Sequence, residues 1–488
     1  MTTTFSRRGF LATSAALAGV SLAPMAAFAQ AAPLTLRATR QTLDIDGRAA
    51  SVFRLVNGAG GSGLVLNPGE RFRVDLTNEL DVETIIHWHG QIPPNVQDGV
   101  PDMPMPMLKP GEVRSYDYAP MPGTFWMHSH VPVQEMAMLA APLIVRSAAD
   151  AAADRQEVVM FLHDFSFKSA EEVLAEITGT AHTEGMAHAE AAPAAPSMGG
   201  MAMGGMNMGG MAMGGMAMDL NDYDFDAYLA NDRTFDDPEV VAVENGGRVR
   251  LRVINAAAAT VFWIDTGAVA GRLVAVDGHQ IQPVTGRRFG VAMAQRLDIE
   301  LDLPPGATAF PVLALREGAR ERTGIILAAP GATVSKLASL SDAAHPAFDP
   351  DLAQESSLRA ANPLAIRPAE RMEMLMLSGS MQPYVWTING QTWGNHQPIA
   401  AKSGQRVELM FHNMSMMGHP MHLHGHVFQV VGIGNRRFAG AMRDTVYVPP
   451  MASVTIALDA GEAARWMLHC HHMPHLASGM MTEFAVGA

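Results

Sequence analysis

The chain has 488 residues, of which 48% are hydrophobic and 17% charged, so it can build packed cores and pervasive disorder is excluded. Its 34 Lys and Arg against 48 Asp and Glu give a net charge of −14, which argues against a nucleic-acid partner because such a partner requires a basic face. A single cysteine excludes an internal disulfide framework and a multi-cysteine zinc site. The 36 methionines and 19 histidines stand out, since thioether and imidazole groups are both copper ligands.

The first 29 residues predict an export signal that is removed from the mature protein. Arg7 and Arg8 precede an Ala-rich apolar run over residues 11–28, and Ala29 supplies a small residue before the expected cleavage point. Paired arginines at this position are typical of the twin-arginine route, which predicts a periplasmic protein. A transmembrane anchor is the alternative, but the run is short and contains Pro24, and no later stretch reaches spanning length. We therefore expect an exported protein without a membrane span.

The remaining chain reads as short β-strands separated by Gly and Pro turns. Three alternating strands, each after a Gly turn and each closed by an Asn, resemble one another: residues 71–76, 248–254 and 406–411. Recurrence at wide intervals predicts an all-β fold of three sandwich domains. We place these domains at residues 30–150, 151–335 and 361–488, with a linker at 336–360. The best helical candidate after the signal spans residues 168–177.

Low-complexity sequence interrupts the second domain within a loop of about residues 182–218. Residues 198–218 contain 9 Met and 8 Gly, and Gly at that density cannot hold a helix or a packed strand. One interpretation is a disordered linker whose methionines are incidental. The favoured interpretation is a copper-catching loop, because thioethers select Cu(I). The candidate Cu(I) ligands in this loop are Met201, Met203, Met206, Met208, Met211 and Met213.

Four segments near the two ends of the chain each contain a His-x-His pair, where a random distribution gives about 0.7 pairs in the whole chain. The pairs are His87 with His89, His128 with His130, His422 with His424, and His469 with His471. Side chains at i and i+2 of a strand share a face about 6.6 Å apart, so each pair can present two imidazoles to neighbouring metal ions. Together they offer eight nitrogens for a metal cluster.

The single cysteine predicts a second kind of metal site. Cys470 is followed by His475 and Met480, and His419 lies just before the His422 pair. Two histidines, one cysteine and a distant methionine are the ligands of a blue-copper electron-transfer centre. A buried core thiol is the alternative for Cys470 taken alone. Because Cys470 lies between His469 and His471, this site and the cluster would be joined by a few covalent bonds.

The motifs HWHG, HSH, HPMHLHG and HCHHMPHLASGM resemble those of multicopper oxidases, specifically the three-domain bacterial group of laccase-like and periplasmic copper-resistance oxidases. The resemblance covers about residues 40–488. It implies three cupredoxin-like Greek-key β-sandwich domains and four copper ions, one type 1, one type 2 and two type 3. It assigns the type 1 copper to His419, Cys470, His475 and Met480, the type 2 copper to His87 and His422, one type 3 copper to His89, His128 and His471, and the other to His130, His424 and His469.

The resemblance also implies the reaction, in which four one-electron oxidations are coupled to the reduction of O₂ to water. Electrons would pass from Cys470 to His469 and His471. Oxygen reduction consumes protons, and Asp98 matches a family acid near the type 2 copper, although an ordinary turn aspartate is the alternative. Some relatives carry a second acid where Leu476 stands, so the sequence does not locate a second proton relay.

The substrate is left open between a metal ion, Cu(I) or Fe(II), and a phenol. Cu(I) oxidation with a role in copper tolerance is the first hypothesis, and a laccase acting on phenols or aromatic amines is the alternative. Met416 and Met417 precede His419 and are candidate Cu(I) ligands, although Ser415 stands where a partnering acid is expected. The alternating series Met372, Met374 and Met376 is expected to fill the core instead.

Three further expectations complete the interpretation. The protein is expected to be a monomer. A copper store or a scaffold is disfavoured, because the ligand pattern of ten His and one Cys is complete. A copper nitrite reductase, which would need two domains and a mononuclear catalytic copper, is disfavoured by the chain length and by the paired His-x-His motifs.

Overall fold

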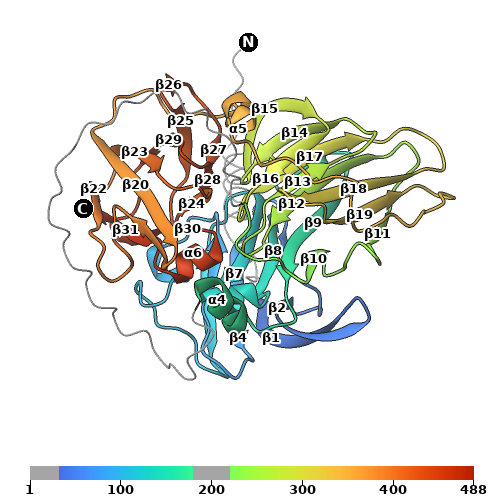
Figure 1. Cartoon of the computed structure of the whole chain (residues 1–488), viewed down its shortest axis with the longest axis horizontal. Coiled ribbons are helices and arrows are strands. Elements are labelled where there is room, and N and C mark those ends of the chain that lie inside the picture. The colour runs from blue at the N-terminus through green and yellow to red at the C-terminus, as the bar shows by residue number, and fades with distance from the viewer. Residues whose placement is uncertain (1–31, 180–219) are drawn as a thin grey trace, which may run out of the picture.

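The computed structural model describes residues 32–179 and 220–488 (Figure 1). The predicted export signal and the Met-rich loop, with its six candidate methionines, lie outside these residues. The described chain forms six sheets that pack in pairs as three β-sandwiches, which we call the N-terminal, middle and C-terminal sandwiches. This confirms the predicted all-β fold of three cupredoxin-like domains. No helix in the described ranges is long and apolar enough to cross a membrane.

The N-terminal sandwich packs the sheet β2-β1-β4-β6 against the sheet β3-β8-β7-β5. Its strands are β1 (Leu34–Ile45), β2 (Arg48–Asn57), β3 (Leu64–Leu66), β4 (Phe72–Asn78), β5 (Ile86–His89), β6 (Val113–Tyr118), β7 (Gly123–Ser129) and β8 (Ala140–Val145). The short helices η1 (Asn95–Gln97), α2 (Pro132–Met136) and α3 (Ala148–Ala152) belong to its connections.

The middle sandwich packs a six-stranded sheet, β10-β9-β12-β17-β14-β15, against a five-stranded sheet, β11-β19-β18-β13-β16. The first consists of β9 (Gln156–Phe165), β10 (Ala227–Ala230), β12 (Arg248–Asn255), β14 (Gly271–Val276), β15 (His279–Gly286) and β17 (Arg296–Asp302). The second consists of β11 (Val240–Ala242), β13 (Phe262–Asp265), β16 (Arg288–Val291), β18 (Ala309–Arg316) and β19 (Arg322–Ala328).

The predicted helix near residues 168–177 is confirmed as α4 (Ala170–Thr178), which follows β9. It begins with a capping box, in which the Ser169 side chain accepts from the Glu172 backbone N–H and Glu172 accepts from that of Ser169. It ends at Gly179, whose φ of 71° suits a residue without Cβ.

The C-terminal sandwich follows α5 (Ala353–Ser357) and packs the sheet β21-β20-β23-β29-β25-β26, with β27 beside β25, against the sheet β22-β31-β30-β24-β28. The first sheet consists of β20 (Arg371–Met381), β21 (Tyr384–Ile388), β23 (Arg406–Asn413), β25 (Phe428–Ile433), β26 (Arg436–Arg437), β27 (Met442–Arg443) and β29 (Ser453–Asp459). The second consists of β22 (Ile399–Lys402), β24 (His419–Leu423), β28 (Thr445–Val448), β30 (Arg465–Cys470) and β31 (Met481–Gly487), and α6 (Met473–Ala477) lies between its last two members.

The three similar strands of the sequence occupy equivalent places in the three sandwiches. β4, β12 and β23 each pair in parallel with the first long strand of their sandwich and antiparallel with another strand on the other side. The closing Asn78, Asn255 and Asn413 are buried, and each donates its side-chain amide to backbone carbonyls and accepts from the N–H two residues on. The same set of Asn side-chain hydrogen bonds therefore ends each of these three strands.

One expectation about the core is wrong. Met372, Met374 and Met376 were expected to fill the core, but their side chains are 66%, 58% and 42% exposed. The buried positions of β20 are Leu375 and Leu377, so the methionines occupy the outward face of the strand.

Candidate metal centre

The predicted type 1 ligands meet inside the C-terminal sandwich. His419 begins β24, Cys470 ends β30, and His475 lies on α6, so two adjacent strands and one short helix bring them together. The two Nδ1 atoms of His419 and His475 lie 3.1 Å apart, and the Cys470 Sγ lies 3.7 and 3.6 Å from them. All three residues are buried, and this spacing suits a trigonal His₂Cys copper site.

The fourth predicted ligand, Met480, belongs to the same structural unit. Its carbonyl accepts from the Cys470 N–H at 3.0 Å, and its own N–H donates to the His475 carbonyl at 3.0 Å. Its side chain is buried in the core of the C-terminal sandwich, in the same cluster as Cys470. Met480 is thus held beside the ligands by main-chain bonds.

A polar side chain lies beside the outer nitrogen of each of the two type 1 histidines. Ser415 Oγ lies 2.9 Å from His419 Nε2, at the position where an acid was expected. Asp222 Oδ2 lies 3.5 Å from His475 Nε2 and accepts from the Tyr384 hydroxyl. Burial acts to raise the pKa of Asp222, but His472, His475 and Tyr384 together lower it to about 2. Asp222 is therefore a carboxylate beside the edge of the predicted type 1 site.

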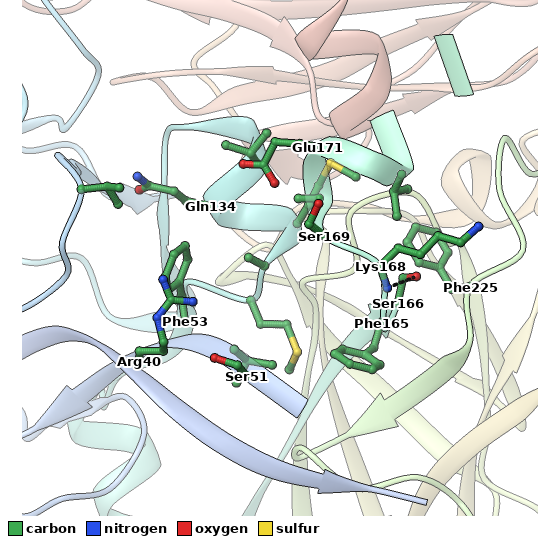
Figure 2. Close-up of a pocket in the computed structure, with 18 of the residues that line it drawn as sticks. Arg40, Ser51, Phe53, Gln134, Phe165, Ser166, Lys168, Ser169, Glu171 and Phe225 are labelled. Atoms are coloured by element: carbon green, nitrogen blue, oxygen red, sulfur yellow. Dashed lines mark hydrogen bonds between the residues drawn. The ribbon is translucent and has the colours of Figure 1, made fainter. Parts of the chain in front are cut away.

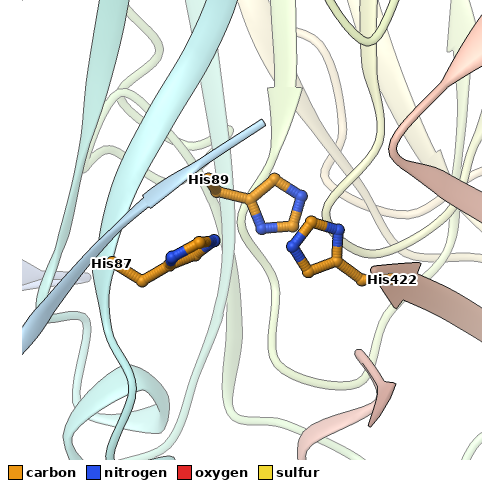
Figure 3. A group of neighbouring side chains, drawn as sticks. All are labelled: His87, His89 and His422. Atoms are coloured by element: carbon orange, nitrogen blue, oxygen red, sulfur yellow. The ribbon is translucent and has the colours of Figure 1, made fainter. Parts of the chain in front are cut away.

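The eight histidines of the four pairs converge between the N-terminal and C-terminal sandwiches. His87 and His89 lie on β5, and the register pairs His87 with His128 of β7. On the other side, the register pairs His422 of β24 with His469 of β30. Figure 3 shows His87 and His89 of one sandwich facing His422 of the other. All eight side chains are buried.

The cluster contains the predicted type 3 groupings. His89, His128 and His471 form one group whose nitrogens lie within 4.8 Å of one another, and His130, His424 and His469 form another. His87 and His422, the predicted type 2 pair, form a third group together with His89. The structure thus brings together all eight histidines, with the two proposed type 3 triads as separate groups and His89 shared with the third group.

The hydrogen bonds of the cluster leave lone pairs facing each other. His424 Nδ1 lies 2.8 Å from Asp98 Oδ2, and His469 Nδ1 lies 3.0 Å from the Cys470 carbonyl. Because both Nδ1 atoms donate, both Nε2 atoms are acceptors, yet they lie only 3.1 Å apart. His87 and His422 likewise donate from Nδ1 to backbone carbonyls and bury an unpartnered Nε2. A bound cation resolves such contacts, so the donor set fits copper ions.

Burial favours the neutral form of His422, His424, His469 and His471, which is the form that binds metal. It lowers the pKa of His469 to about 3 and the pKa of His471 well below its usual value. It raises the pKa of the Cys470 thiol, which would therefore ionise only with help from a bound cation.

Asp98 lies at the cluster, as the sequence predicted. It follows η1, and its carboxylate oxygens lie 2.8 Å from His424 Nδ1 and 3.4 Å from His87 Nδ1. The Asp98 side chain is buried, so it is no ordinary solvent-exposed turn residue.

Two further acids at the cluster were missed by the sequence analysis. Glu135 of α2 places Oε2 at 2.8 Å from His128 Nδ1, and burial raises its pKa well above the usual value. It lines one small cavity together with Leu476, the residue that replaces the family's second acid. Asp444 lies 3.1 Å from His89 Nε2 and forms a buried ion pair with Arg296 of the middle sandwich. The sequence signal available for Glu135 was its position five residues after His130 of the HSH motif.

The methionines near the type 1 site divide between core and surface. Met417 is buried in the core of the C-terminal sandwich, whereas Met416 is 44% exposed. Of the two candidates, Met416 is the one that solvent reaches.

Figure 2 shows a pocket elsewhere, between β1, β2, α2 and α4. Arg40, Phe53 and Glu171 line it, and none of the predicted copper ligands does. The predicted copper ligands therefore lie apart from that pocket.

Comparisons with known proteins agree with this geometry. The multicopper oxidase family matches residues 37–150, 182–328 and 366–488. The multicopper oxidase MmcO of Mycobacterium tuberculosis is 30% identical over 98% of this chain and 96% of its own length. The chain belongs to the multicopper oxidase family. Copper resistance protein A of Escherichia coli is 23% identical over 95% of this chain and 94% of its own. The laccase of Botrytis aclada superposes with a TM-score of 0.72 at 20% identity, covering 92% of this chain and 87% of that one.

Membership establishes the chemistry in general terms. This multicopper oxidase is an oxidoreductase that uses copper and couples the oxidation of a reducing substrate to the reduction of O₂.

Proposed function

We propose that this multicopper oxidase oxidises Cu(I), acts as a monomer in the periplasm after twin-arginine export, and serves copper tolerance. We further propose four copper ions per chain, held as the sequence assigns them: type 1 by His419, Cys470, His475 and Met480, type 2 by His87 and His422, and type 3 by His89, His128 and His471 and by His130, His424 and His469. Copper ions bound by these residues would supply one-electron acceptance at the type 1 site and four-electron reduction of O₂ at the cluster.

The contact between Asp222 and His475 supports a metal-ion substrate most directly. Asp222 follows the last methionine of the Met-rich segment, Met218, by four residues, so chain length alone keeps that methionine within about 14 Å of it. A carboxylate with a lowered pKa attracts a cation at any physiological pH. A fixed negative charge therefore lies beside the predicted type 1 site, and in the sequence it follows directly on the Met-rich segment.

The side chains of this multicopper oxidase have separate tasks in the proposed reaction. Ser415 Oγ contacts the outer nitrogen of His419, and Asp222 lies 3.5 Å from that of His475. Both Nδ1 atoms face Cys470 Sγ. Cys470 connects through its own backbone to His469 and His471, which gives electrons a short covalent route. Asp98 holds His424 and offers a buried carboxylate for protons.

Phenol oxidation is the second candidate, in keeping with the laccase likeness. The burial of His475 beneath Asp222 and Tyr384 disfavours it, because an aromatic ring could not touch the imidazole directly. An electron from a phenol would have to cross these two side chains.

Replacing residues 198–218 by a Gly-Ser linker of equal length tests the substrate. We expect kcat/KM for Cu(I) to fall about tenfold or more, while phenol oxidation is kept or rises. A proportional loss of both activities would contradict the proposal. Metal analysis of the purified enzyme should give four coppers, and the Cys470→Ser variant should hold three and lack the blue colour of the parent.

A further inference from the structure

The outward face of one sheet of the C-terminal sandwich carries a row of methionines. Met372, Met374 and Met376 alternate along β20 and are exposed, while Leu375 and Leu377 of the same strand are buried. β20 is an interior strand between β21 and β23, so these side chains do not serve to prevent edge-to-edge pairing of the sheet.

The neighbouring strand adds two more donors to this face. β20 and β23 pair in parallel, with Met374 opposite Met410 and Met376 opposite His412. Both partners are half-buried and alternate with the buried Leu409 and Phe411. Strands lie about 4.8 Å apart and same-face residues about 6.6 Å apart, so these four side chains stand at the corners of one small rectangle.

Packing does not explain this choice of residues. An exposed methionine contributes no free energy of burial to folding, and its sulfur is susceptible to oxidation. Thr or charged residues are more usual on the outer face of a sheet. The His412 ring is also fixed, because its Nδ1 lies 2.7 Å from Ser453 Oγ. This leaves Nε2 for another partner on the face that carries the thioethers.

We propose that Met374, Met376, Met410 and His412 form a surface site for one Cu(I) ion, separate from the four resident coppers. Three thioethers and one imidazole are soft and borderline ligands, which select Cu(I) over hard cations. The unbranched methionine side chains can adjust from the corners of the rectangle to one ion. The nearby carboxylates are engaged elsewhere, with Glu408 paired to Arg437 and Glu373 to Arg371, so a hard divalent cation would find no free oxygen ligand among them.

The position of this site suggests its use. β23 continues directly into Met414, Ser415 and Met416, of which the two methionines are exposed and Ser415 contacts His419. The Met414 N–H also donates to the Leu377 carbonyl at 2.9 Å, which keeps this segment beside β20. Thioethers thus extend from the face to the segment that carries a type 1 ligand. Delivery of Cu(I) along this row rests on the proposed function, whereas binding at the site does not.

Silver(I) tests the binding because it is a soft monovalent ion that the enzyme cannot oxidise. Copper-loaded protein would be titrated with Ag(I) against a competing chelator, using the parent and the double variant Met374→Leu/Met376→Leu. The matched control is Met105→Leu/Met107→Leu, which removes another alternating pair of methionines. We expect the face variant to hold one Ag(I) fewer per chain than the parent and the control. Equal counts in all three would overturn the site.

Two further measurements complete the test. His412→Gln should weaken the same Ag(I) about tenfold, and an unchanged affinity would remove His412 from the site. Phenol oxidation by the face variant should equal that of the parent, which confirms its fold, while kcat/KM for Cu(I) should fall severalfold. An unchanged kcat/KM for Cu(I) would overturn the proposed delivery of Cu(I) along this row of methionines. If the parent itself failed to oxidise Cu(I), the proposed function would fail while the Ag(I) counts still decided the site.

Discussion

His424 of the C-terminal sandwich and Asp98 of the N-terminal sandwich are 326 residues apart in the chain, yet His424 Nδ1 lies 2.8 Å from Asp98 Oδ2. The contact orients a predicted type 3 ligand and places a carboxylate beside the predicted type 2 ligand His87. In the proposed reaction, one side chain would therefore both orient a ligand and supply protons.

Asp98→Asn is expected to separate these two tasks. The amide oxygen can still accept from His424, whereas the proton-exchanging carboxylate is lost. O₂ consumption should fall about 100-fold, in the range of general acid–base effects, with copper content and blue colour kept. Asp102→Asn is the control, since its φ of 58° suits Asn equally well. Unchanged O₂ consumption in Asp98→Asn would refute the proton role.

Glu135 is expected to act by positioning His128. Glu135→Ala removes the carboxyl group 2.8 Å from His128 Nδ1, which leaves only the Ser129 carbonyl at 2.9 Å to orient the ring, and should weaken type 3 copper binding about 10-fold to 100-fold. Glu135→Gln retains an acceptor and should retain the copper. Copper retention during dialysis against a chelator measures this, with Glu171→Ala on the exposed face of α4 as the control. Equal copper loss in the Ala and Gln variants would contradict the positioning role.

Asp222→Asn is expected to discriminate between substrates. The change removes a negative charge 3.5 Å from His475 while preserving the shape of the side chain. Cu(I) oxidation should fall about tenfold in kcat/KM and phenol oxidation by much less, because only the cation is attracted by the carboxylate. Asp224→Asn, at an exposed neighbouring carboxylate, is the control. A larger loss for the phenol than for Cu(I) would count against a metal-ion substrate.

The metal-free protein is expected to lose stability as the pH falls below about 6.5. Burial lowers the folded pKa of His469 to about 3 and that of the non-ligand His163 to about 4, so below pH 6.5 the unfolded chain binds more protons than the folded one. At pH 5 each such histidine lowers the free energy of unfolding by about 2 kcal/mol.

Thermal unfolding of metal-free and copper-loaded protein between pH 7 and pH 5 measures this effect. The midpoint of the metal-free protein should fall by roughly 10 °C or more over this range. The copper-loaded protein should stay above it at every pH, because the bound metal competes with protons for the imidazoles. An unfolding midpoint of the metal-free protein that is the same at pH 7 and pH 5 contradicts the predicted pH dependence.

The sequence by itself determined the donor atoms and their local geometry. Strand alternation is a local property, so HWHG and HSH predict two imidazoles on one face, and Cys470 between two histidines predicts a thiol on the other. The repeated Gly turn, alternating strand and closing Asn likewise predicted three related sandwiches, since each Asn acts within a few residues of its own strand end.

Tertiary structure alone decided which face of each strand is buried and which distant side chains meet. Alternation along β20 is the same whether Leu375 or Met374 points inward. Only packing against the second sheet decides which of these two faces is buried. Asp222 and Asp444 reach their histidines from irregular segments, and Glu135 does so from the short helix α2 that follows β7. No strand or helix period encodes these contacts. The ligands follow from chain-local geometry, whereas the groups that orient them follow from how the sandwiches pack.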